Sequence, residues 1–393
     1  MKILTFTTLF PNTVFPTRCV FTKERISPLA KMNGCEVKVV APVPYFPPLK
    51  VSGRWALSQV PRRETIDGID VYHPRYFVTP KIGMSSYGYM MYYGSLPTVR
   101  KIREEFDFDI IDAHFVYPDG FAGVLLGRYF RKPVVVTSHG TDMNLYPTFP
   151  VIRRFLRHTL NRANCVISVC QAIKDVMVQM GISSEKISVI PNAIDLKKFY
   201  PLDKQEARRR LGISAEKMVL SVGALIPIKN HDSLIKAVKI LNDRDPGRNI
   251  SLIIVGEGPM RKKLQKLIFS LGMSGQVRLA GSVPHQELHL WFSAADLSSL
   301  PSRREGWPCV ILESLACGTP VVASDVWGIP EIIRSDRVGL LTKTNEWDIA
   351  EKLDTALNTS WDSEEIVQYA REYTWERFAR DIHDVYCSVL RNP

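Results

Sequence analysis

The run Ser251-Leu252-Ile253-Ile254-Val255 has the length of a strand and is apolar after its first residue. Val134-Val135-Val136 is a run of the same kind in the first half of the chain. Strands that are buried on both faces have this composition, and such strands occur mainly in parallel sheets that are covered by helices. The two runs therefore indicate an α/β fold.

Short β-branched runs alternate with helix-length segments along the whole chain. In the first half we expect strands at residues 2–7, 36–41, 109–113, 133–138, 165–169 and 186–190. In the second half we expect them at 218–222, 251–255, 276–280, 296–300, 319–323 and 338–341. Two sets of about six strands with helices between them predict two doubly wound, Rossmann-like α/β domains.

The domain boundary can be located from turn residues. Pro191-Asn192-Ala193-Ile194-Asp195 begins a stretch without helical periodicity, and a helix at 205–211 follows and ends at Gly212. We therefore expect domains at 1–195 and 196–372. Apolar residues at 3–4-residue spacing over 375–390 predict an amphipathic C-terminal helix.

The chain of 393 residues has 51 Lys and Arg against 40 Asp and Glu, a net charge of +11. Residues 1–200 hold 26 basic and 15 acidic side chains and residues 201–393 hold 25 of each, so the whole excess lies in the first half. Such an asymmetry concerns partners more than fold. Nucleic acid, an anionic membrane or an anionic substrate would each explain it, and so would a basic surface that only keeps the protein soluble.

Two segments of the first half bear on that choice. Residues 87–94 read Tyr-Gly-Tyr-Met-Met-Tyr-Tyr-Gly, for which packing between helices is the favoured interpretation. Residues 153–162 read Arg-Arg-Phe-Leu-Arg-His-Thr-Leu-Asn-Arg and form a basic amphipathic segment. A solvated helix face explains this second segment as well as contact with a membrane or a lipid-linked acceptor does.

Several protein classes are excluded. The 45% hydrophobic and 23% charged residues are ordinary for a globular chain, and no window reaches the ~18 apolar residues of a transmembrane helix. The start, Met1-Lys2-Ile3-Leu4-Thr5-Phe6, resembles a strand rather than a signal peptide, so we expect a cytoplasmic protein. The seven cysteines form no Cys-x-x-Cys pair and have no histidine at zinc spacing, which argues against a metal site or a disulfide framework.

The stretch that carries most chemistry is 301–324, Pro-Ser-Arg-Arg-Glu-Gly-Trp-Pro-Cys-Val-Ile-Leu-Glu-Ser-Leu-Ala-Cys-Gly-Thr-Pro-Val-Val-Ala-Ser. A strand ends near Leu300, and Pro308 fits the first turn of a helix that runs to Ala316. The start of that helix can hold a diphosphate, because its N–H groups lack partners and its dipole is positive there. Glu305 precedes this start and Glu313 lies about 7.5 Å into the helix. One ligand with hydroxyls at both ends would meet both carboxylates.

This segment resembles the Glu–seven residues–Glu signature of retaining GT-B glycosyltransferases of family 4. The resemblance covers almost the whole chain, through Pro191-Asn192-Ala193-Ile194-Asp195, Val255-Gly256-Glu257-Gly258-Pro259, Gly281-Ser282-Val283-Pro284, Gly328-Ile329-Pro330-Glu331-Ile332 and Trp375-Glu376-Arg377-Phe378. Each motif is weak alone, but their order and spacing are specific. The resemblance implies a GT-B fold with two Rossmann-like domains facing a central cleft. The domain at 1–195 would bind the acceptor, the domain at 196–372 the nucleotide sugar, and the helix at 373–393 would cross back to the first domain.

The resemblance also implies the donor-binding residues. Glu305 would contact hydroxyls of the donor sugar, Glu313 the ribose, and Lys229 the leaving diphosphate. Backbone groups near Val283 would meet the nucleobase. The rest of the donor set comprises Gly223, Gly256, Gly306, Trp307, Pro308, Cys309 and Val310, of which the last five would line the diphosphate and the sugar.

Two places depart from the family pattern. The family usually has Gly-Arg-Leu before the lysine, but this chain has Gly223-Ala224-Leu225, so one of the two cations at the phosphates is missing. Losing such a cation ordinarily reduces transition-state stabilisation, and Arg303 or Arg304 is a candidate replacement. The loop at 10–18 has no glycine where many members have Gly-Gly, and its prolines stiffen it.

The first domain contributes two histidines and an arginine. His114 and His139 lie at or just beyond strand ends, where the ligand crevice of an open α/β sheet forms. His139 matches the active-site histidine of the family, whose carbonyl and ring would face the anomeric carbon and a sugar hydroxyl. His114 matches a position near the acceptor, and Arg18 would meet an anionic acceptor. His139, Glu305 and Lys229 make up the predicted catalytic set.

We therefore predict a retaining glycosyltransferase that uses a nucleoside-diphosphate sugar as its substrate and needs no cofactor. No Asp-x-Asp motif is present, so metal-independent transfer is expected. The resemblance favours cell-surface polysaccharide enzymes of the teichuronic-acid type, with a glycan or lipid-linked acceptor. The protein would then be cytoplasmic or peripheral on the inner face of an anionic membrane.

Other functions remain as alternatives. A sugar-nucleotide hydrolase or epimerase of the same fold would leave no acceptor-linked product. A non-catalytic sugar-nucleotide-binding subunit is favoured only by Ala224. A dehydrogenase is disfavoured because no Gly-x-Gly-x-x-Gly follows an early strand. Nucleic acid is disfavoured as a partner because no nucleic-acid-binding module appears.

Overall fold

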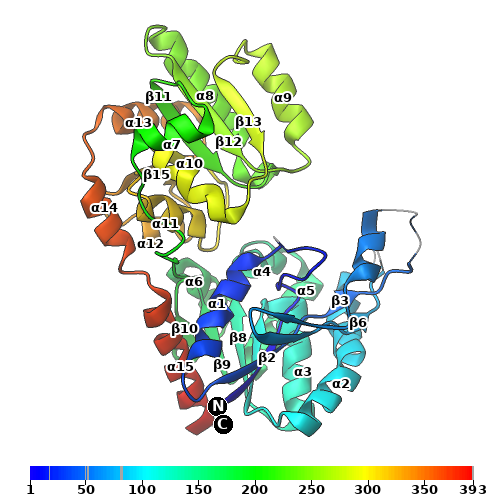
Figure 1. Cartoon of the computed structure of the whole chain (residues 1–393). Coiled ribbons are helices and arrows are strands. Elements are labelled where there is room, and N and C mark those ends of the chain that lie inside the picture. Colours follow the sequence, from blue (N-terminus) through cyan, green and yellow to red (C-terminus); the bar gives the residue numbers. More distant parts are fainter. Residues whose placement is uncertain (17, 49, 51–52, 80–82, 392–393) are drawn as a thin grey trace. The chain divides into compact units, whose positions relative to one another are not determined.

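The computed structural model describes residues 1–16, 18–48, 50, 53–79 and 83–391. The chain forms two compact units (Figure 1). Unit 1 comprises Met1–Asn192 and Trp375–Pro393, and unit 2 comprises Ala193–Thr374. From the sequence we expect the first domain to end at residue 195 and the second at residue 372. Thr17 of the 10–18 loop, and Asn392 and Pro393 of the expected last segment, lie outside the described residues.

Unit 1 is built on an eight-stranded sheet with the order β10-β9-β8-β7-β1-β2-β5-β4. Seven strands are parallel, and β1 lies in the middle with Ile3 opposite Ile110 on one side and Val37 on the other. The strands are β1 (Lys2–Phe6), β2 (Glu36–Val40), β4 (Arg63–Ile66), β5 (Ile69–Tyr72), β7 (Ile110–His114), β8 (Val134–Ser138), β9 (Cys165–Ser168) and β10 (Ile187–Val189), with β3 (Val43–Pro44) and β6 (Arg75–Tyr76) in a separate pair.

The antiparallel edge of this sheet is a hairpin that the sequence analysis missed. Strands β4 and β5 are joined by Asp67 and Gly68, which have φ values of 51° and 83°. Asp-Gly is favoured where both turn residues need positive φ, so the signal was present in the sequence. The prediction of about six strands is therefore corrected: the described part of unit 1 has eight strands in this sheet and two more, β3 and β6, in a separate pair.

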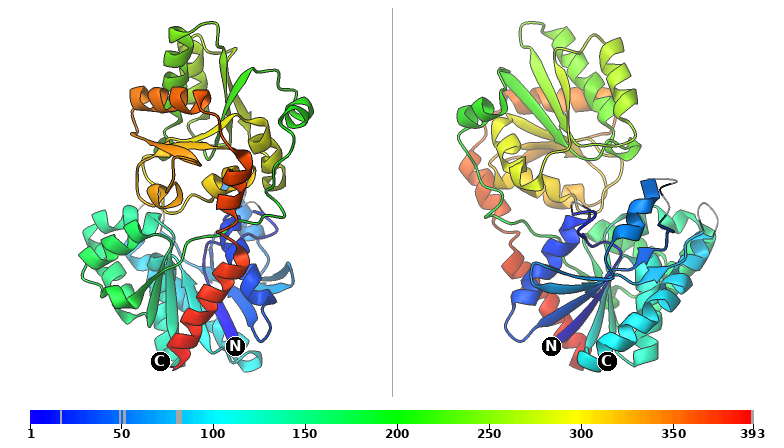
Figure 2. Two further views of the ribbon diagram at one scale, coloured as in Figure 1. Left: turned by 90° about the vertical axis from the view of Figure 1, so that its left-hand side faces the viewer. Right: turned by 45° about the vertical axis from the view of Figure 1, so that its right-hand side comes forward.

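Helices cover both faces of the sheet, as buried parallel strands require. They are α1 (Val20–Lys31), α2 (Tyr87–Glu105), α3 (Phe121–Phe130), α4 (Thr141–Asn144), α5 (Pro150–Arg162), α6 (Gln171–Gln179) and α15 (Trp375–Arg391). The C-terminal helix α15 packs beside α1 (Figure 2). Its apolar stripe, which includes Phe378, Ile382 and Tyr386, is buried.

Unit 2 is built on a fully parallel six-stranded sheet with the order β13-β12-β11-β14-β15-β16. Its strands are β11 (Lys217–Val222), β12 (Ile250–Val255), β13 (Val277–Gly281), β14 (Leu297–Leu300), β15 (Val321–Ser324) and β16 (Gly339–Thr342). The chain winds outward from β11 in one direction and from β14 in the other. The prediction of two doubly wound α/β domains is confirmed, and the switch point of unit 2 lies between β11 and β14.

Helix α7 of unit 2 shows how capping residues set where a helix begins and ends. Asp203 accepts a hydrogen bond from the Glu206 N–H at the start of α7 (Lys204–Leu211), and Gly212 ends this helix with a φ of 62°. The other helices are α8 (His231–Arg244), α9 (Arg261–Ser270), α10 (Leu288–Ala294), α11 (Cys309–Ala316), α12 (Ile329–Ile332), α13 (Glu346–Asn358) and α14 (Ser363–Ala370). Across the described ranges, the helices are too short or too polar to cross a bilayer.

Candidate active site

The loops that follow β11 and β14 meet at the switch point of unit 2. Lys229 ends the loop after β11, and Glu305 lies in the loop after β14. The Lys229 Nζ lies 2.6 Å from Glu305 Oε1, and both side chains are largely buried. Because ligands of open α/β sheets bind at such a point, a paired cation and carboxylate here can serve an anionic, hydroxyl-bearing ligand.

Asn230 holds these two loops together. It is buried with a φ of 56°, and its side-chain amide donates to the carbonyls of Pro301 (3.0 Å) and Thr344 (2.8 Å). Its Oδ1 accepts from Arg303, whose Nη2 is 2.8 Å away. Arg303 is thus anchored beside Lys229, whereas Ala224 brings no cation.

Two glycines of the predicted donor set, Gly223 and Gly256, allow the loops after β11 and β12 to approach each other closely. The Gly223 N–H donates to Val255 O at 2.9 Å, and Gly256 has a φ of 147°. A Cβ atom on Gly256 would lie 2.0 Å from Gly223 O, a separation too short for any side chain to be accommodated there. Gly223 and Gly256 therefore set the distance between the loops after β11 and β12.

Glu313 is buried in α11 and has a partner that the sequence analysis missed. The His285 Nε2 lies 2.9 Å from Glu313 Oε1, and the Phe199 ring contacts His285 edge-on at 5.2 Å. His285 comes two residues after the half-buried Val283 and directly follows a motif of the family. The position of His285 directly after this motif was the signal in the sequence by which it could have been predicted.

The remaining residues of the predicted donor set form the loop before α11 and the start of that helix. Trp307 is buried against Tyr373, with ring centroids 5.9 Å apart, and the Cys309 thiol lies 3.9 Å from Trp307 O. Pro308 has an extended ψ of 99° and caps α11 instead of occupying its first turn, which corrects our expectation. Gly306 and Val310 are half-buried on either side of it. The first turn of α11 therefore directly follows the loop that contains Glu305.

Unit 1 brings together its two predicted histidines. His114 Nδ1 lies 3.0 Å from His139 Nε2, and His114 Nε2 lies 2.8 Å from Asp112 Oδ2. Both ring nitrogens of His114 are therefore used within the protein, and its assignment to the acceptor side stays a prediction. Asp112 was not among the predicted residues, although it lies two positions before His114 on the same face of β7.

Burial and neighbouring charges determine the ionisation states of Asp112 and His139. Burial would raise the pKa of Asp112, but the neighbouring His114 and Arg25 outweigh it and lower that pKa. Burial, together with His114 and Arg25, holds the pKa of His139 well below its usual range. Asp112 is therefore an anion and His139 is neutral at physiological pH.

Arg18 is exposed on the loop after β1. Burial raises the pKa of the neighbouring Cys19 thiol, and the charge of Arg18 offsets only part of that rise. The structure does not bring Arg18 into hydrogen-bonding contact with His114 or His139. Across the described part of the chain, no three His, Cys, Asp or Glu side chains gather as metal ligands would.

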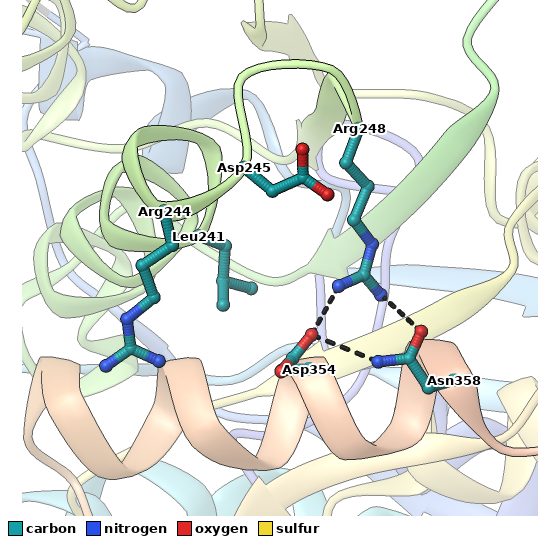
Figure 3. Close-up of a pocket in the computed structure, with 6 residues that line it drawn as sticks. All are labelled: Leu241, Arg244, Asp245, Arg248, Asp354 and Asn358. Carbon is teal, nitrogen blue, oxygen red and sulfur yellow. Dashed lines mark hydrogen bonds and ion pairs between the residues drawn. The ribbon is translucent and has the colours of Figure 1, made fainter.

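A polar pocket of about 330 Å³ lies elsewhere in unit 2 (Figure 3). Its lining residues are Leu241, Arg244, Asp245, Arg248, Asp354 and Asn358. Arg248 is paired with Asp354, and Arg244 lies 2.7 Å from Glu351. The α8–β12 loop in its wall precedes a strand, whereas Lys229 and Glu305 follow strands. This pocket therefore lies at the opposite edge of the sheet from Lys229 and Glu305.

Comparison with known proteins places these features in a family. Residues 203–373 match the model of glycosyl transferases group 1, and residues 23–198 match the model of glycosyltransferase family 4. The putative teichuronic acid biosynthesis glycosyltransferase TuaC of Bacillus subtilis is 29% identical over 99% of this chain and 94% of its own. The D-inositol 3-phosphate glycosyltransferase of Corynebacterium glutamicum is 30% identical over 74% of each chain.

Solved structures share the fold. Anabaena HepE in complex with UDP superposes with a TM-score of 0.75 at 22% identity, over 99% of this chain and 100% of that chain.

Proposed function

The chain belongs to the glycosyl transferases group 1 and has the GT-B fold, and on this premise we propose that it transfers a sugar, with retention, from a nucleoside-diphosphate sugar to a lipid-linked glycan. The contact between Lys229 and Glu305 carries the proposal most directly. It joins a cation suited to a diphosphate with a carboxylate suited to sugar hydroxyls, at the switch point of a Rossmann-like sheet.

In the proposed reaction, each group takes one part of the donor. Lys229 and the first turn of α11 stabilise the leaving diphosphate, and Glu305 orients the sugar through its hydroxyls. Glu313, aligned by His285, binds the ribose. The bond from the anomeric carbon to the phosphate oxygen breaks while the bond to the acceptor oxygen forms on the same face. The acceptor proton passes to the departing phosphate oxygen, so no side chain acts as a nucleophile.

The relatives suggest which substrates to try first. HepE is in complex with UDP, and TuaC is named for teichuronic acid biosynthesis. We therefore propose a uridine-diphosphate sugar as donor and a lipid-linked cell-envelope glycan as acceptor, with no metal ion or cofactor.

The test is product formation by the full chain with a panel of UDP-sugars and lipid-linked acceptors, followed by mass spectrometry. We expect an acceptor one sugar heavier and UDP in equal amount. Glu305→Gln should lower kcat by roughly 100-fold, because an uncharged amide accepts sugar hydroxyls more weakly. Glu351→Gln, on the exposed face of α13, is the matched control.

The other outcomes separate the alternatives. Release of UDP without a heavier acceptor would point to a hydrolase. No UDP release from any donor, together with thermal stabilisation by the sugar nucleotide, would favour a non-catalytic binding subunit.

We further propose that unit 1 contacts an anionic membrane. Arg153, Arg154 and Arg157 are exposed along α5, and Val151 is 55% exposed at its start. The neighbouring helix α2 presents Tyr93 at 65% exposure.

Helix α2 also joins this surface directly. Its residue Tyr89 lies 6.3 Å from the Phe155 ring of α5. In the 87–94 segment, Gly88 and Met91 are buried as the packing interpretation expects, but Tyr89, Met90 and Tyr93 are exposed. Arginines beside exposed aromatic rings fit a lipid headgroup layer.

Sedimentation with liposomes tests this surface. The wild-type chain should bind anionic vesicles in low salt and leave them as salt rises. Replacing Arg153, Arg154 and Arg157 by glutamine should remove most of the binding, at about 1 kcal/mol for each charge. Replacing the exposed Lys262, Lys263 and Lys266 of α9 in unit 2 is the matched control. Equal recovery with neutral and anionic vesicles would contradict the proposal.

A further inference from the structure

The loop after β14 carries an arginine that is anchored to the loop after β11. We infer that Arg303 binds the diphosphate of the donor together with Lys229, with one edge of its guanidinium held by Asn230 and the other edge presented to the phosphate. The identity of the ligand rests on the proposed function, whereas the geometry of the anchored guanidinium does not.

The two loops are joined through their backbones. The Arg303 N–H donates to the Ile228 carbonyl at 2.8 Å, and the side-chain amide of Asn230 donates to the Pro301 carbonyl at 3.0 Å. Ile228 and Asn230 are the residues directly before and after Lys229. The backbone of Arg303 is therefore placed against the short segment that carries the lysine of the donor site.

The side chain of Arg303 is anchored along one edge. Its Nε and Nη2 lie 3.1 and 2.8 Å from Asn230 Oδ1, so a single amide oxygen accepts from both nitrogens. Asn230 is buried, and its own amide is held by two main-chain carbonyls, which prevents it from turning away. An arginine that is anchored in this way loses less side-chain freedom when it binds an anion than a freely rotating one does.

The other edge of the guanidinium is open. Among the residues that the structure describes, Arg303 Nη1 makes no hydrogen bond, and Nη2 lies 4.0 Å from Asp232 Oδ2, which is too far for one. The Arg303 side chain is 56% exposed. Nη1 and Nη2 together form the fork that binds two oxygens of a phosphate. Arg303 can therefore keep its contact with Asn230 and bind a phosphate at the same time.

A second cation changes the charge balance of the donor site. The Lys229 Nζ lies 2.6 Å from Glu305 Oε1, so its charge is already partly compensated. Arg303 adds a positive charge whose ion pair with Asp232 is longer, at 4.0 Å. The diphosphate gains negative charge as the sugar leaves, and a cation that is held in place beforehand stabilises this charge without reorganisation.

Ala224 makes it possible to separate the charge of Arg303 from its packing. It is exposed on the loop after β11, the loop that ends at Lys229. Ala224→Arg would add a cation from that loop without restoring any contact with Asn230. A function of Arg303 that depends on its charge can therefore be rescued from position 224, whereas a function in holding the two loops together cannot.

The experiment is an NMR titration of the full chain with UDP, GDP and ADP, and with the nucleoside of each diphosphate that binds. For Arg303→Gln we expect a Kd for the diphosphate roughly tenfold higher and an unchanged Kd for the nucleoside, because the lost contact is to phosphate alone. Arg303→Lys keeps the charge without the fork and should have an intermediate Kd. Arg244→Gln removes an arginine at the opposite edge of the sheet and is the matched control.

The rescue variant gives a second measurement. The double variant Ala224→Arg/Arg303→Gln should recover most of the affinity for the diphosphate. In the transferase assay kcat of Arg303→Gln should fall roughly 100-fold, because the charge that it stabilises is greatest in the transition state, and the double variant should recover part of this loss.

Three results would overturn the inference. One is an unchanged Kd for the diphosphate in Arg303→Gln. The second is an equal loss of affinity for diphosphate and nucleoside without rescue by Ala224→Arg, which would make Arg303 only an anchor between loops. The third is a loss of binding in Arg304→Gln and not in Arg303→Gln, which would assign the second cation to Arg304.

The outcomes for the proposed function are separate. If Lys229→Met weakens diphosphate binding and Arg303→Gln does not, the proposed donor site stands and the inference fails. If Arg303→Gln behaves as expected but no acceptor gains a sugar, the inference stands and the proposed transfer fails. A wild-type chain that binds none of the three nucleoside diphosphates would contradict both.

Discussion

At the residue scale, the functional groups of this protein occur as pairs. Lys229 contacts Glu305, and His285 contacts Glu313. Pairing satisfies polar groups that would otherwise be buried without partners, and it fixes their orientation. A substrate that enters must replace each of these contacts with one of its own, which favours a ligand that carries both anionic and hydroxyl groups.

One buried residue outside these pairs makes stability depend on pH. Burial raises the pKa of Asp119 to about 7, although a hydrogen bond from the Thr8 N–H opposes the shift. Between about pH 4 and pH 7 the folded state keeps a proton that the unfolded state has lost. The free energy of unfolding should therefore fall as pH rises through this window, by at most about 1.4 kcal/mol for each pH unit.

Asp119→Asn tests this dependence, because the amide keeps an acceptor for Thr8 and cannot ionise. Urea unfolding at pH 5, 6, 7 and 8 should show the variant gaining stability over the wild type up to about pH 7 and levelling above it. Asp175→Asn, an exposed site in the same unit, should follow the wild type. Parallel profiles for Asp119→Asn and the wild type would refute the assignment.

The sequence predicted both members of the first pair, Lys229 and Glu305, but only Glu313 of the second pair. Glu305, Glu313 and His139 stand in motifs with a fixed spacing, which a sequence displays directly. Asp112 and His285 are indicated more weakly by the sequence. Asp112 alternates with His114 along a strand, and His285 directly follows a motif. Arg25 is not indicated at all, because its burial beside Phe378 is created by α15, which lies far away in the sequence.

At the scale of elements, burial on both faces decided which strands could be predicted. Strands such as Val134–Ser138 are buried at every position, and this strand begins with the apolar run Val134-Val135-Val136. The edge strand Arg63–Ile66 has no buried residue and alternates in exposure, so composition alone did not reveal it. The missed part of the fold is thus the part whose stability comes from a turn and an edge rather than from apolar burial.

The loops of unit 2 offer a test of element spacing. Gly256→Ala places a Cβ atom 2.0 Å from Gly223 O, whereas Gly272→Ala meets nothing within 4 Å. Gly272, with a φ of 68°, lies in the left-handed helical region, where a Cβ atom costs about 1–2 kcal/mol. Gly256, with a φ of 147°, lies in a region that essentially only glycine populates, so its backbone cost is at least as large. The free energy of unfolding of Gly256→Ala should be about 1–3 kcal/mol lower than that of Gly272→Ala, because of steric overlap. UDP should also stabilise Gly256→Ala less than Gly272→Ala. Equal unfolding midpoints for the two variants would show that the loops can move apart.

At the scale of the whole molecule, the net charge and the proposed anion site lie in different units. Unit 1 has 27 basic and 17 acidic side chains, a net charge of +10, whereas unit 2, which contains Lys229 and α11, has 24 basic and 23 acidic ones, a net charge of +1. A diphosphate is held by a few placed groups at short range, whereas net charge acts over a Debye length of about 8 Å in physiological salt and is screened beyond it. Net charge is therefore a poor guide to the donor site.

Hydrogen exchange with UDP measures where that site is. We expect slower exchange in unit 2 over residues 223–230, 281–285 and 301–313, because the nucleotide would order the loops after β11, β13 and β14. Lys229→Met should reduce this protection without changing exchange in the core strand β12. The basic helix α5 should not respond to UDP, since its proposed partner is a bilayer. Protection concentrated in α5 instead would assign the nucleotide to unit 1 and reverse the proposed roles of the two units.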